Sequence, residues 1–487
     1  IDVSLVGSEM CIRDSSMDSS ELISIGNCKE KGVGTLAQRK PLYIKTYGCQ
    51  MNEYDSQKLA RLLERDYYLV DRAEEAKLVL INTCSVRDKP QQKLYSLLGE
   101  LSRFKAADRE YMIGVGGCVA QQEGESITKR SKAVDFVFGT HNLSLVPSLI
   151  ESRRAGAGQQ VAIDYREDWE ELPLGAPGIS PGAKHDRSRV SAYVSISRGC
   201  NKNCTYCIVP TTRGKEVSRA EDEILREVRL AAHRGVKEIV LLGQTVNSYG
   251  RDLVPRKSFV DLLRSVSEIE GIERIRFTSP HPQEVRQDFI DLVCDTPKVC
   301  HHIHMPLQSG SDRILKAMNR NYRRAKYLSI IDALKQRVPD MAITTDIIVG
   351  FPGETERDFE ETLEVMDLVE FYNSYSFVFS PRPGTPAASL EDSMPHSAKL
   401  ERLQVLQARQ TELTQRQLAA WYGKVVEVLL DGPSTSDSQC LQGRMPQNVV
   451  VNLVEPDAVL EPGMTVPVEI VEVSRHTLRG RRIEEGL

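Results

Sequence analysis

Three cysteines in one short run constrain this chain more than any other feature. Cys200, Cys204 and Cys207 have C-x3-C-x2-C spacing and follow the stretch 194–197, whose alternating apolar and polar residues predict a strand. Three thiolates in one loop suit zinc or an iron–sulfur cluster. A cubane cluster takes four ligands, so three cysteines leave one iron open to another molecule. The alternative is a structural zinc site, but zinc is usually closed by four ligands and no second C-x2-C pair follows.

The composition predicts a multidomain globular protein. A length of 487 residues suggests about three domains, and 40% hydrophobic with 27% charged residues is ordinary for such proteins. The net charge of −5 does not indicate general nucleic-acid binding, so any RNA contact must come from local patches. No apolar stretch is long enough to cross a bilayer. With eleven cysteines and no signal peptide, we expect reduced thiols or metal ligands and a cytoplasmic location.

The first predicted domain, residues 41–154, alternates strands with helices and therefore predicts a parallel sheet. Its clearest strand is the apolar run 77–82, and its clearest helix spans 90–103 with leucines on one stripe. Residues 1–39 are predicted to be a disordered lead. Within it, 1–16 resembles translated sequencing-adapter read-through, which places the natural start at or near Met17.

Three further cysteines, Cys49, Cys84 and Cys118, each come just past a predicted strand of this first domain. Because the C-terminal ends of parallel strands share one edge, these cysteines can converge in space. Gly48, Gly116 and Gly117 would let the backbone approach a bulky ligand. A single cysteine is more often a buried core thiol, but the common placement of all three favours a second three-cysteine cluster.

The second predicted domain, residues 186–418, follows a Gly- and Pro-rich linker over 151–190 and repeats the strand–helix unit. About six units predict a partial barrel, whose chemistry lies at the C-terminal strand ends. Ser218 with Glu221, and Thr355 with Asp358, predict capping boxes at two of its helices. The Cys200 loop lies at a strand end, and so do the residues that we expect to contact a cofactor: Gly243, Gln244, Asn247, Gln308 and Gly350.

Two weaker patterns lie in the same domain. Cys300, His302 and His304 alternate along a predicted strand and could bind a metal, although a polar barrel interior is the preferred interpretation. The turn from Gly350 to Gly353 could suggest a phosphate loop. It lacks the GK[ST] ending, so a close approach to the cofactor is favoured instead.

The tail, residues 421–484, contains short apolar strands that predict a small OB-like barrel. It ends in the basic run 475–482, which is either a phosphate-binding patch or a solvated end.

Together these motifs resemble the radical S-adenosylmethionine (SAM) methylthiotransferase family over nearly the whole chain from residue 41. The segments 47–52, 81–87 and 116–120 resemble the family's N-terminal cluster motifs. The run 199–207 resembles the radical SAM loop, and the tail resembles a TRAM domain. The segments 243–249 and 443–452 are most similar to the MiaB-type branch. The implied fold class is α/β: an N-terminal parallel-sheet domain, a partial (βα)6 radical SAM barrel and a C-terminal β-barrel.

The resemblance implies the reaction, the cofactors and the partners. The substrate would be N6-isopentenyladenosine at position 37 of tRNA, which would gain a methylthio group at C2. Two [4Fe-4S] clusters are expected, one on Cys200, Cys204 and Cys207 and the other on the three N-terminal cysteines. SAM would serve both as methyl donor and as radical source. An electron donor such as flavodoxin would reduce the first cluster.

Three alternatives remain open on the sequence. The same chemistry could act on threonylcarbamoyl-adenosine of tRNA. It could act on a ribosomal-protein aspartate, which a TRAM domain argues against. The chain could also be a non-catalytic iron–sulfur carrier, which would need neither a barrel large enough for SAM nor an RNA-type tail.

Overall fold

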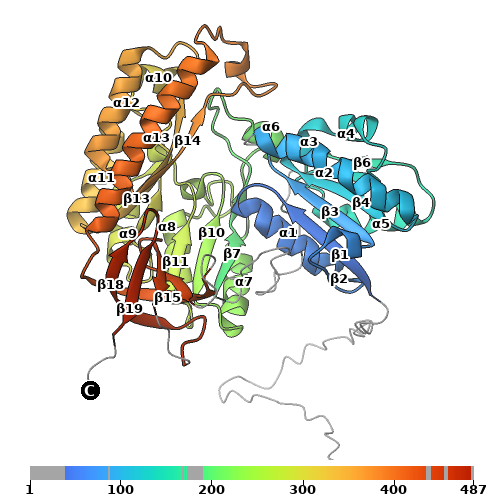
Figure 1. Ribbon diagram of the computed structural model, residues 1–487, viewed down its shortest axis with the longest axis horizontal. Helices are drawn as coiled ribbons and strands as arrows, with labels where there is room; N and C mark the ends of the chain where they lie inside the picture. The colour runs from blue at the N-terminus through green and yellow to red at the C-terminus, as the bar shows by residue number, and fades with distance from the viewer. Residues whose placement is uncertain are drawn as a thin grey trace, which may run out of the picture.

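The computed structural model describes residues 39–85, 88–166, 169, 172, 190–434, 440–454 and 459–483. Figure 1 shows an N-terminal α/β body beside a larger central body, with a small strand-rich body at the lower end of the central one. The predictions for residues 1–38 and for most of the linker, 173–189, lie outside the described residues.

The N-terminal body is a six-stranded parallel sheet in the order β2-β1-β3-β4-β5-β6. Every residue of the central strands β3 and β4 is buried, because helices cover both faces and each face has its own apolar core. The strands are β1 Lys40–Thr46, β2 Tyr67–Leu69, β3 Leu78–Thr83, β4 Met112–Gly117, β5 Phe136–Phe138 and β6 Gln160–Ala162. The helices are α1 Gln50–Leu63, α2 Asp88–Ala107, α3 Cys118–Glu123, α4 Glu125–Arg130 and α5 Val146–Arg154, with 3-10 turns η2 Ala73–Glu75 and η3 Leu143–Leu145.

The last strand of this sheet, β6, lies inside the segment that the sequence analysis assigns to a linker. A strand of three residues is too short to show a periodic pattern in the sequence, and β6 forms through its pairing with β5.

The central body contains six parallel strands and confirms the partial barrel. The sheets β11-β10-β7 and β12-β13-β14 are joined by a parallel bridge between Ile275 and Val299. The strands are β7 Ser191–Ser195, β10 Glu238–Leu242, β11 Arg274–Phe277, β12 His302–His304, β13 Ala342–Val349 and β14 Asn373–Val378. The helices are α6 Val209–Arg213, α7 Glu221–His233, α8 Phe259–Ser267, α9 Gln287–Asp295, α10 Asp312–Ala317, α11 Arg324–Arg337, α12 Glu356–Val369 and α13 His396–Ala419. One large apolar core joins these strands and helices.

The predicted capping box of α12 is confirmed, and that of α7 is wrong. Thr355 and Asp358 hydrogen-bond reciprocally at the start of α12. The residue that caps α7 is Ala220, because Ser218 is in strand β9, Val217–Ser218. The Ser218 hydroxyl accepts a hydrogen bond from the backbone N–H of Gly250 instead. A side chain already used by a neighbouring loop cannot cap the helix.

The C-terminal body is a small barrel, as predicted; it is closed and has five strands in the order β15-β16-β17-β19-β18. Its strands are β15 Val425–Pro433, β16 Leu441–Arg444, β17 Val450–Leu453, β18 Thr465–Val473 and β19 Leu478–Arg482. The basic run therefore includes a barrel strand, in which Leu478 and Gly480 are buried.

Two buried arginines attach this small barrel to the central one. Arg274 donates to the carbonyl oxygens of Glu427 and Arg444. Arg276 donates to those of Met445 and Pro446 at 2.9 and 2.8 Å. Because β11 begins at Arg274, the C-terminal barrel lies at the end opposite the C-terminal strand ends. No helix in the described part of the chain is long and apolar enough to cross a membrane.

Candidate functional site

The Cys200 loop begins at a tight turn after β7. The short strand β8, Ser197–Arg198, pairs with β9 and leads into Gly199, whose φ is +72°. A Cβ on Gly199 would lie 2.0 Å from the carbonyl oxygen of Lys215. Only glycine fits this position, both because of its backbone angle and because of that contact.

Other segments hold the rest of the loop in place. The backbone N–H of Thr205 donates to the Met318 carbonyl at 3.0 Å, and its carbonyl accepts from Ala387 at 2.8 Å. The side chain of Asn319 donates to the Asn203 carbonyl at 2.7 Å. The loop is therefore fixed from the end of α10 and from the segment after β14.

Polar groups approach the sulfur atoms of this loop. The backbone N–H of Lys202 donates to Cys200 Sγ at 3.4 Å, and the Thr245 hydroxyl lies 3.4 Å from the same sulfur. The Arg320 guanidinium lies 3.8 Å from Cys204 Sγ and donates to it. Donors at the sulfur atoms stabilise thiolates and tune a cluster bound to them. The donor set therefore fits an iron–sulfur cluster.

Burial favours the neutral form of two thiols of the loop, Cys200 and Cys207. It raises the pKa of Cys207 to about 12 and also raises the pKa of Cys200. Metal binding requires thiolates, so loading this site would release protons.

The predicted cofactor residues line the same end of the barrel as the Cys200 loop. Gly243 and Gln244 follow β10, and a Cβ on Gly243 would lie 2.6 Å from the Ser197 hydroxyl. The Gln244 Oε1 and Ser197 Oγ atoms are buried and have no hydrogen-bond partner among the described residues. Such unpartnered atoms fit the polar groups of SAM.

Asn247, Gln308 and Gly350 mainly fix the backbone. The side chain of Asn247 accepts from the His281 N–H and donates to the His281 carbonyl, so both of its polar atoms are used. Gln308 has a φ of +70° and bridges to Ile347 of β13. Gly350 has a φ of +68°, and a Cβ there would lie 2.5 Å from the Lys399 side chain. These residues shape the rim, and their direct contact with SAM stays a prediction.

The second cysteine set lies at the C-terminal edge of the N-terminal sheet. Cys49 precedes α1, Cys84 follows β3, and Cys118 begins α3. A Cβ on Gly48 would lie 2.5 Å from the Cys84 Cβ, so the Cys49 and Cys84 segments are in contact. Cys49 is exposed, whereas Cys84 and Cys118 are buried.

A buried arginine from the central body completes the surroundings of this set. Arg213, the last residue of α6, donates to Asp55 Oδ2 at 3.0 Å and to Asn52 Oδ1 at 3.3 Å. A hydrogen bond with Cys84 and the nearby Arg213 charge lower the pKa of Cys49 to about 6. The Arg213 charge also acts on Cys118. Cys49 and Cys118 thus both lie near one cation, and for Cys49 that cation favours the thiolate.

These supporting residues were not predicted from the sequence. Asn52 and Asn82 exchange amide hydrogen bonds that join α1 to β3. Both occur inside the quoted motifs, so their positions next to the cysteines were a usable signal. Arg213 and Arg320 have no local pattern, because they contact the sites through the tertiary fold.

In the described ranges, no three His, Cys, Asp or Glu side chains are grouped as ligands of one ion. A cubane does not need such a group, because each of its thiolates binds a different iron atom. Cys300, His302 and His304 likewise form no such ligand group. His302 and His304 both contact the Thr344 hydroxyl, at 3.2 and 3.1 Å, and His304 lies 3.4 Å from Asp346. This is the polar barrel interior that the sequence predicts.

Three family models match the chain. The Radical SAM superfamily matches residues 194–366, the TRAM domain matches 422–483, and the uncharacterized protein family UPF0004 matches 41–139. Among solved structures, the radical SAM methyltransferase TsrM from Kitasatospora setae aligns with a TM-score of 0.54 and 12% identity. That alignment covers 72% of this chain and 75% of TsrM, and it supports the fold alone.

Curated relatives resemble the chain over almost their whole length. The tRNA-2-methylthio-N(6)-dimethylallyladenosine synthase of Herminiimonas arsenicoxydans is 46% identical over 449 residues, which cover 91% of this chain and 98% of the relative. The protein of the same name from Acidovorax sp. (strain JS42) is 47% identical over 452 residues, covering 91% and 97%. The chain is therefore a radical SAM transferase that belongs to the family of tRNA-2-methylthio-N(6)-dimethylallyladenosine synthases.

Proposed function

We propose that the chain adds a methylthio group to C2 of N6-isopentenyladenosine at position 37 of tRNA. The observation that carries this proposal is the contact between the two cysteine sites. Arg213 lies six residues after Cys207 and donates to Asn52 and Asp55 in the N-terminal body. Helix α6 therefore connects the Cys200 loop to the Cys49 site, as a reaction that uses both sites requires.

The two sites would hold two [4Fe-4S] clusters with separate roles. Cys200, Cys204 and Cys207 would hold one, and SAM would bind beside them near Gly243 and Gln244. When bound, these groups supply reductive cleavage of SAM to a radical that can attack an unactivated C–H bond. A second SAM would supply the methyl group. Cys49, Cys84 and Cys118 would hold the other cluster, which serves sulfur delivery.

The chain's own residues orient and shield these groups. Lys202 and Arg320 provide donors at the sulfur atoms of Cys200 and Cys204. Arg213 places its positive charge beside the Cys49 site, where it favours thiolates. The proposed domains are 41–154, 186–418 and 421–484. An electron carrier such as flavodoxin is the proposed reductant, and the cytoplasm is the proposed location.

Mass spectrometry of tRNA nucleosides tests the substrate. The gene would be expressed in a host that lacks its own enzyme, and the nucleosides compared with those of the empty host. Appearance of 2-methylthio-N6-isopentenyladenosine is the expected result. A methylthio group on threonylcarbamoyl-adenosine, or on a ribosomal-protein aspartate, would replace the proposed substrate by one of these alternatives. No SAM cleavage by the reduced protein would instead indicate an iron–sulfur carrier.

A further inference from the structure

A cavity of about 140 Å³ reaches Cys204 from the outer surface of the central body. Its lining includes buried Cys204 and His281 together with exposed Asn201 and Asn203. Asn319 and Asn321, also exposed, belong to the same lining. Exposed residues of the cysteine loop therefore separate Cys204, a proposed cluster ligand, from solvent.

A larger cavity of about 560 Å³ adjoins the first and shares Gln283 with it. Basic side chains predominate along the two cavities. Five cations, Lys202, Arg251, Arg256, Lys257 and Arg286, line them against two carboxylates, Glu284 and Asp288. Lys326 adds a sixth cation, since it donates to the Gln283 carbonyl at 2.9 Å. This basic face, defined by those six cations, contrasts with the net charge of −5 of the whole chain.

Part of this positive charge is not neutralised within the chain. Lys202 and Arg251 share Glu284, and Lys257 pairs with Glu221 at 2.7 Å. Arg256 and Arg286 are both exposed, and neither guanidinium group forms an ion pair or hydrogen bond with another described residue. Glu216 acts on Lys202 and Arg251. Glu221, Asp222 and Asp261 act on Lys257, so the acids near the face offset its other cations rather than these two arginines. Two guanidinium groups are thus available to an anionic partner.

We propose that the basic face is the docking surface of an acidic one-electron carrier protein. This inference rests on the proposed function, which requires an external electron. One electron would pass from the carrier to the cluster held by Cys200, Cys204 and Cys207, so the carrier is oxidised by one electron and the cluster reduced by one. No atom or proton is transferred. Redox encounters use small, transient interfaces, and opposite charges mainly raise the association rate.

The tRNA backbone is the other polyanion that a basic face could bind. The position of the cavity favours the electron carrier, because it brings the surface next to Cys204. Electron transfer requires that proximity, whereas a phosphate contact does not.

The test reverses the two available charges in the full-length, cluster-loaded enzyme. Arg256→Glu with Arg286→Glu should lower the second-order rate of cluster reduction by reduced flavodoxin about tenfold at low ionic strength, with the difference vanishing at high salt. Binding of oxidised flavodoxin, followed by its flavin fluorescence, should weaken in parallel. SAM cleavage driven by dithionite should stay unchanged, because a small reductant needs no docking surface. The milder pair Arg256→Gln and Arg286→Gln should give an intermediate loss.

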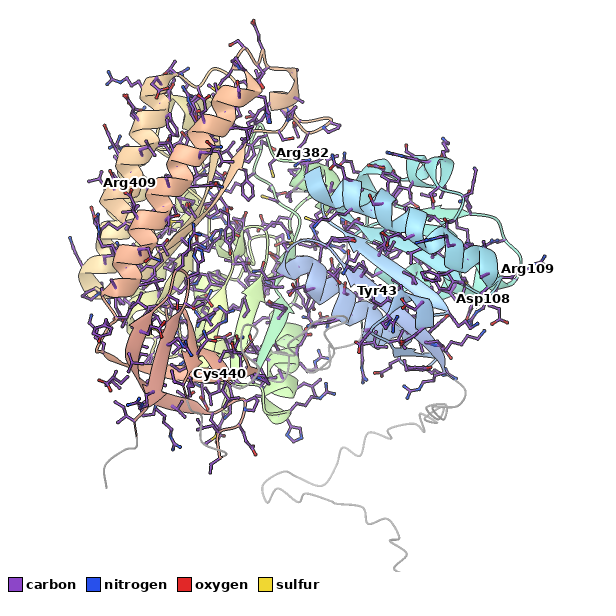
Figure 2. All side chains as sticks on the ribbon, in the orientation of Figure 1. Tyr43, Asp108, Arg109, Arg382, Arg409 and Cys440 are labelled. Carbon is purple, nitrogen blue, oxygen red and sulfur yellow. The ribbon has the colours of Figure 1, made fainter. Side chains whose placement is uncertain are left out.

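The matched control is Arg109→Glu with Lys129→Glu, which changes the net charge equally on the N-terminal body. Arg109 lies at the outer end of that body in Figure 2, far from the central one. Unchanged flavodoxin binding and reduction in the Arg256 and Arg286 variants would overturn the proposal. So would weaker tRNA binding with normal flavodoxin reduction, which would make the face an RNA contact. Absence of dithionite-driven SAM cleavage in the unmodified enzyme would refute the proposed function, while flavodoxin binding would still decide the docking surface.

Discussion

Gly199 determines the path of the chain into the Cys200 loop. Gly199→Ala would place a methyl group against the Lys215 carbonyl in a backbone conformation that costs alanine about 1–2 kcal/mol. The loop must shift, so we expect reconstituted iron to fall by about half while the far-UV circular dichroism spectrum is kept. Gly235→Ala is the control, because Gly235 also has a positive φ but no atom within 4 Å of the new methyl group. Equal iron in the two variants would contradict this role of Gly199.

Glu216 makes stability depend on pH. Burial and the neighbouring Asp252 raise its pKa from 4.5 to about 7. Between these values the folded chain holds a proton that the unfolded chain has lost, so this group's contribution to stability falls as pH rises from about 4.5 to about 7. Glu216→Gln should remove that loss. Urea unfolding should show a stability difference that grows over this window to roughly 3 kcal/mol. A difference independent of pH would exclude the titration of Glu216 as its cause.

Individual site residues differ in how far the sequence predicts them. Cys200, Cys204 and Cys207 lie close together in the sequence, so their spacing alone predicts a shared metal or cluster site. Asn247 was expected at the cofactor because it follows a strand, but its amide is used to hold the His281 backbone. Arg213 had no signal, since its partners Asn52 and Asp55 lie about 160 residues away in sequence.

Helices α1 and α7 join the N-terminal body to the barrel through buried charges. Lys58 of α1 lies 2.7 Å from Glu227 of α7, and both side chains are at most 5% exposed. Arg219 also binds Glu227. Lys58→Met would leave the buried carboxylate with one cation, so we expect a loss of about 3 kcal/mol in unfolding free energy, measured in urea.

The control for this prediction is Lys129→Met, which breaks an exposed pair with Glu125 on α4. That pair should contribute less than about 1 kcal/mol. Similar losses in the two variants would mean that the buried contact between α1 and α7 is not stabilising.

Elements were predicted best where local chemistry agrees with tertiary contacts. Thr355 caps α12 as the sequence predicts, because its hydroxyl bonds to Asp358 within the capping box. Ser218 carries the same signal but is paired in β9 and bound by Gly250. Short strands such as β2 and β6 were missed, since three residues show no periodicity and exist only through pairing.

Across the whole molecule, two parallel-sheet bodies meet near their C-terminal strand ends, and a small barrel lies at the other end of the central one. The sequence predicts all three bodies, because each has its own strand–helix or strand–turn pattern. It does not predict how they join. Arg276, Arg213 and Lys58 make those contacts, and each is a single polar residue without a periodic pattern.

The central claim is that this chain holds two independent three-cysteine cluster sites on separate bodies. The most direct measurement is iron per chain after anaerobic reconstitution. The unmodified protein should bind about eight irons, as two cubanes require. A variant with Cys49, Cys84 and Cys118 all changed to Ala should bind about four, since the other cubane is intact. The matched variant at Cys200, Cys204 and Cys207 should also bind about four. Full iron in either triple variant, or loss of all iron in one of them, would contradict the account.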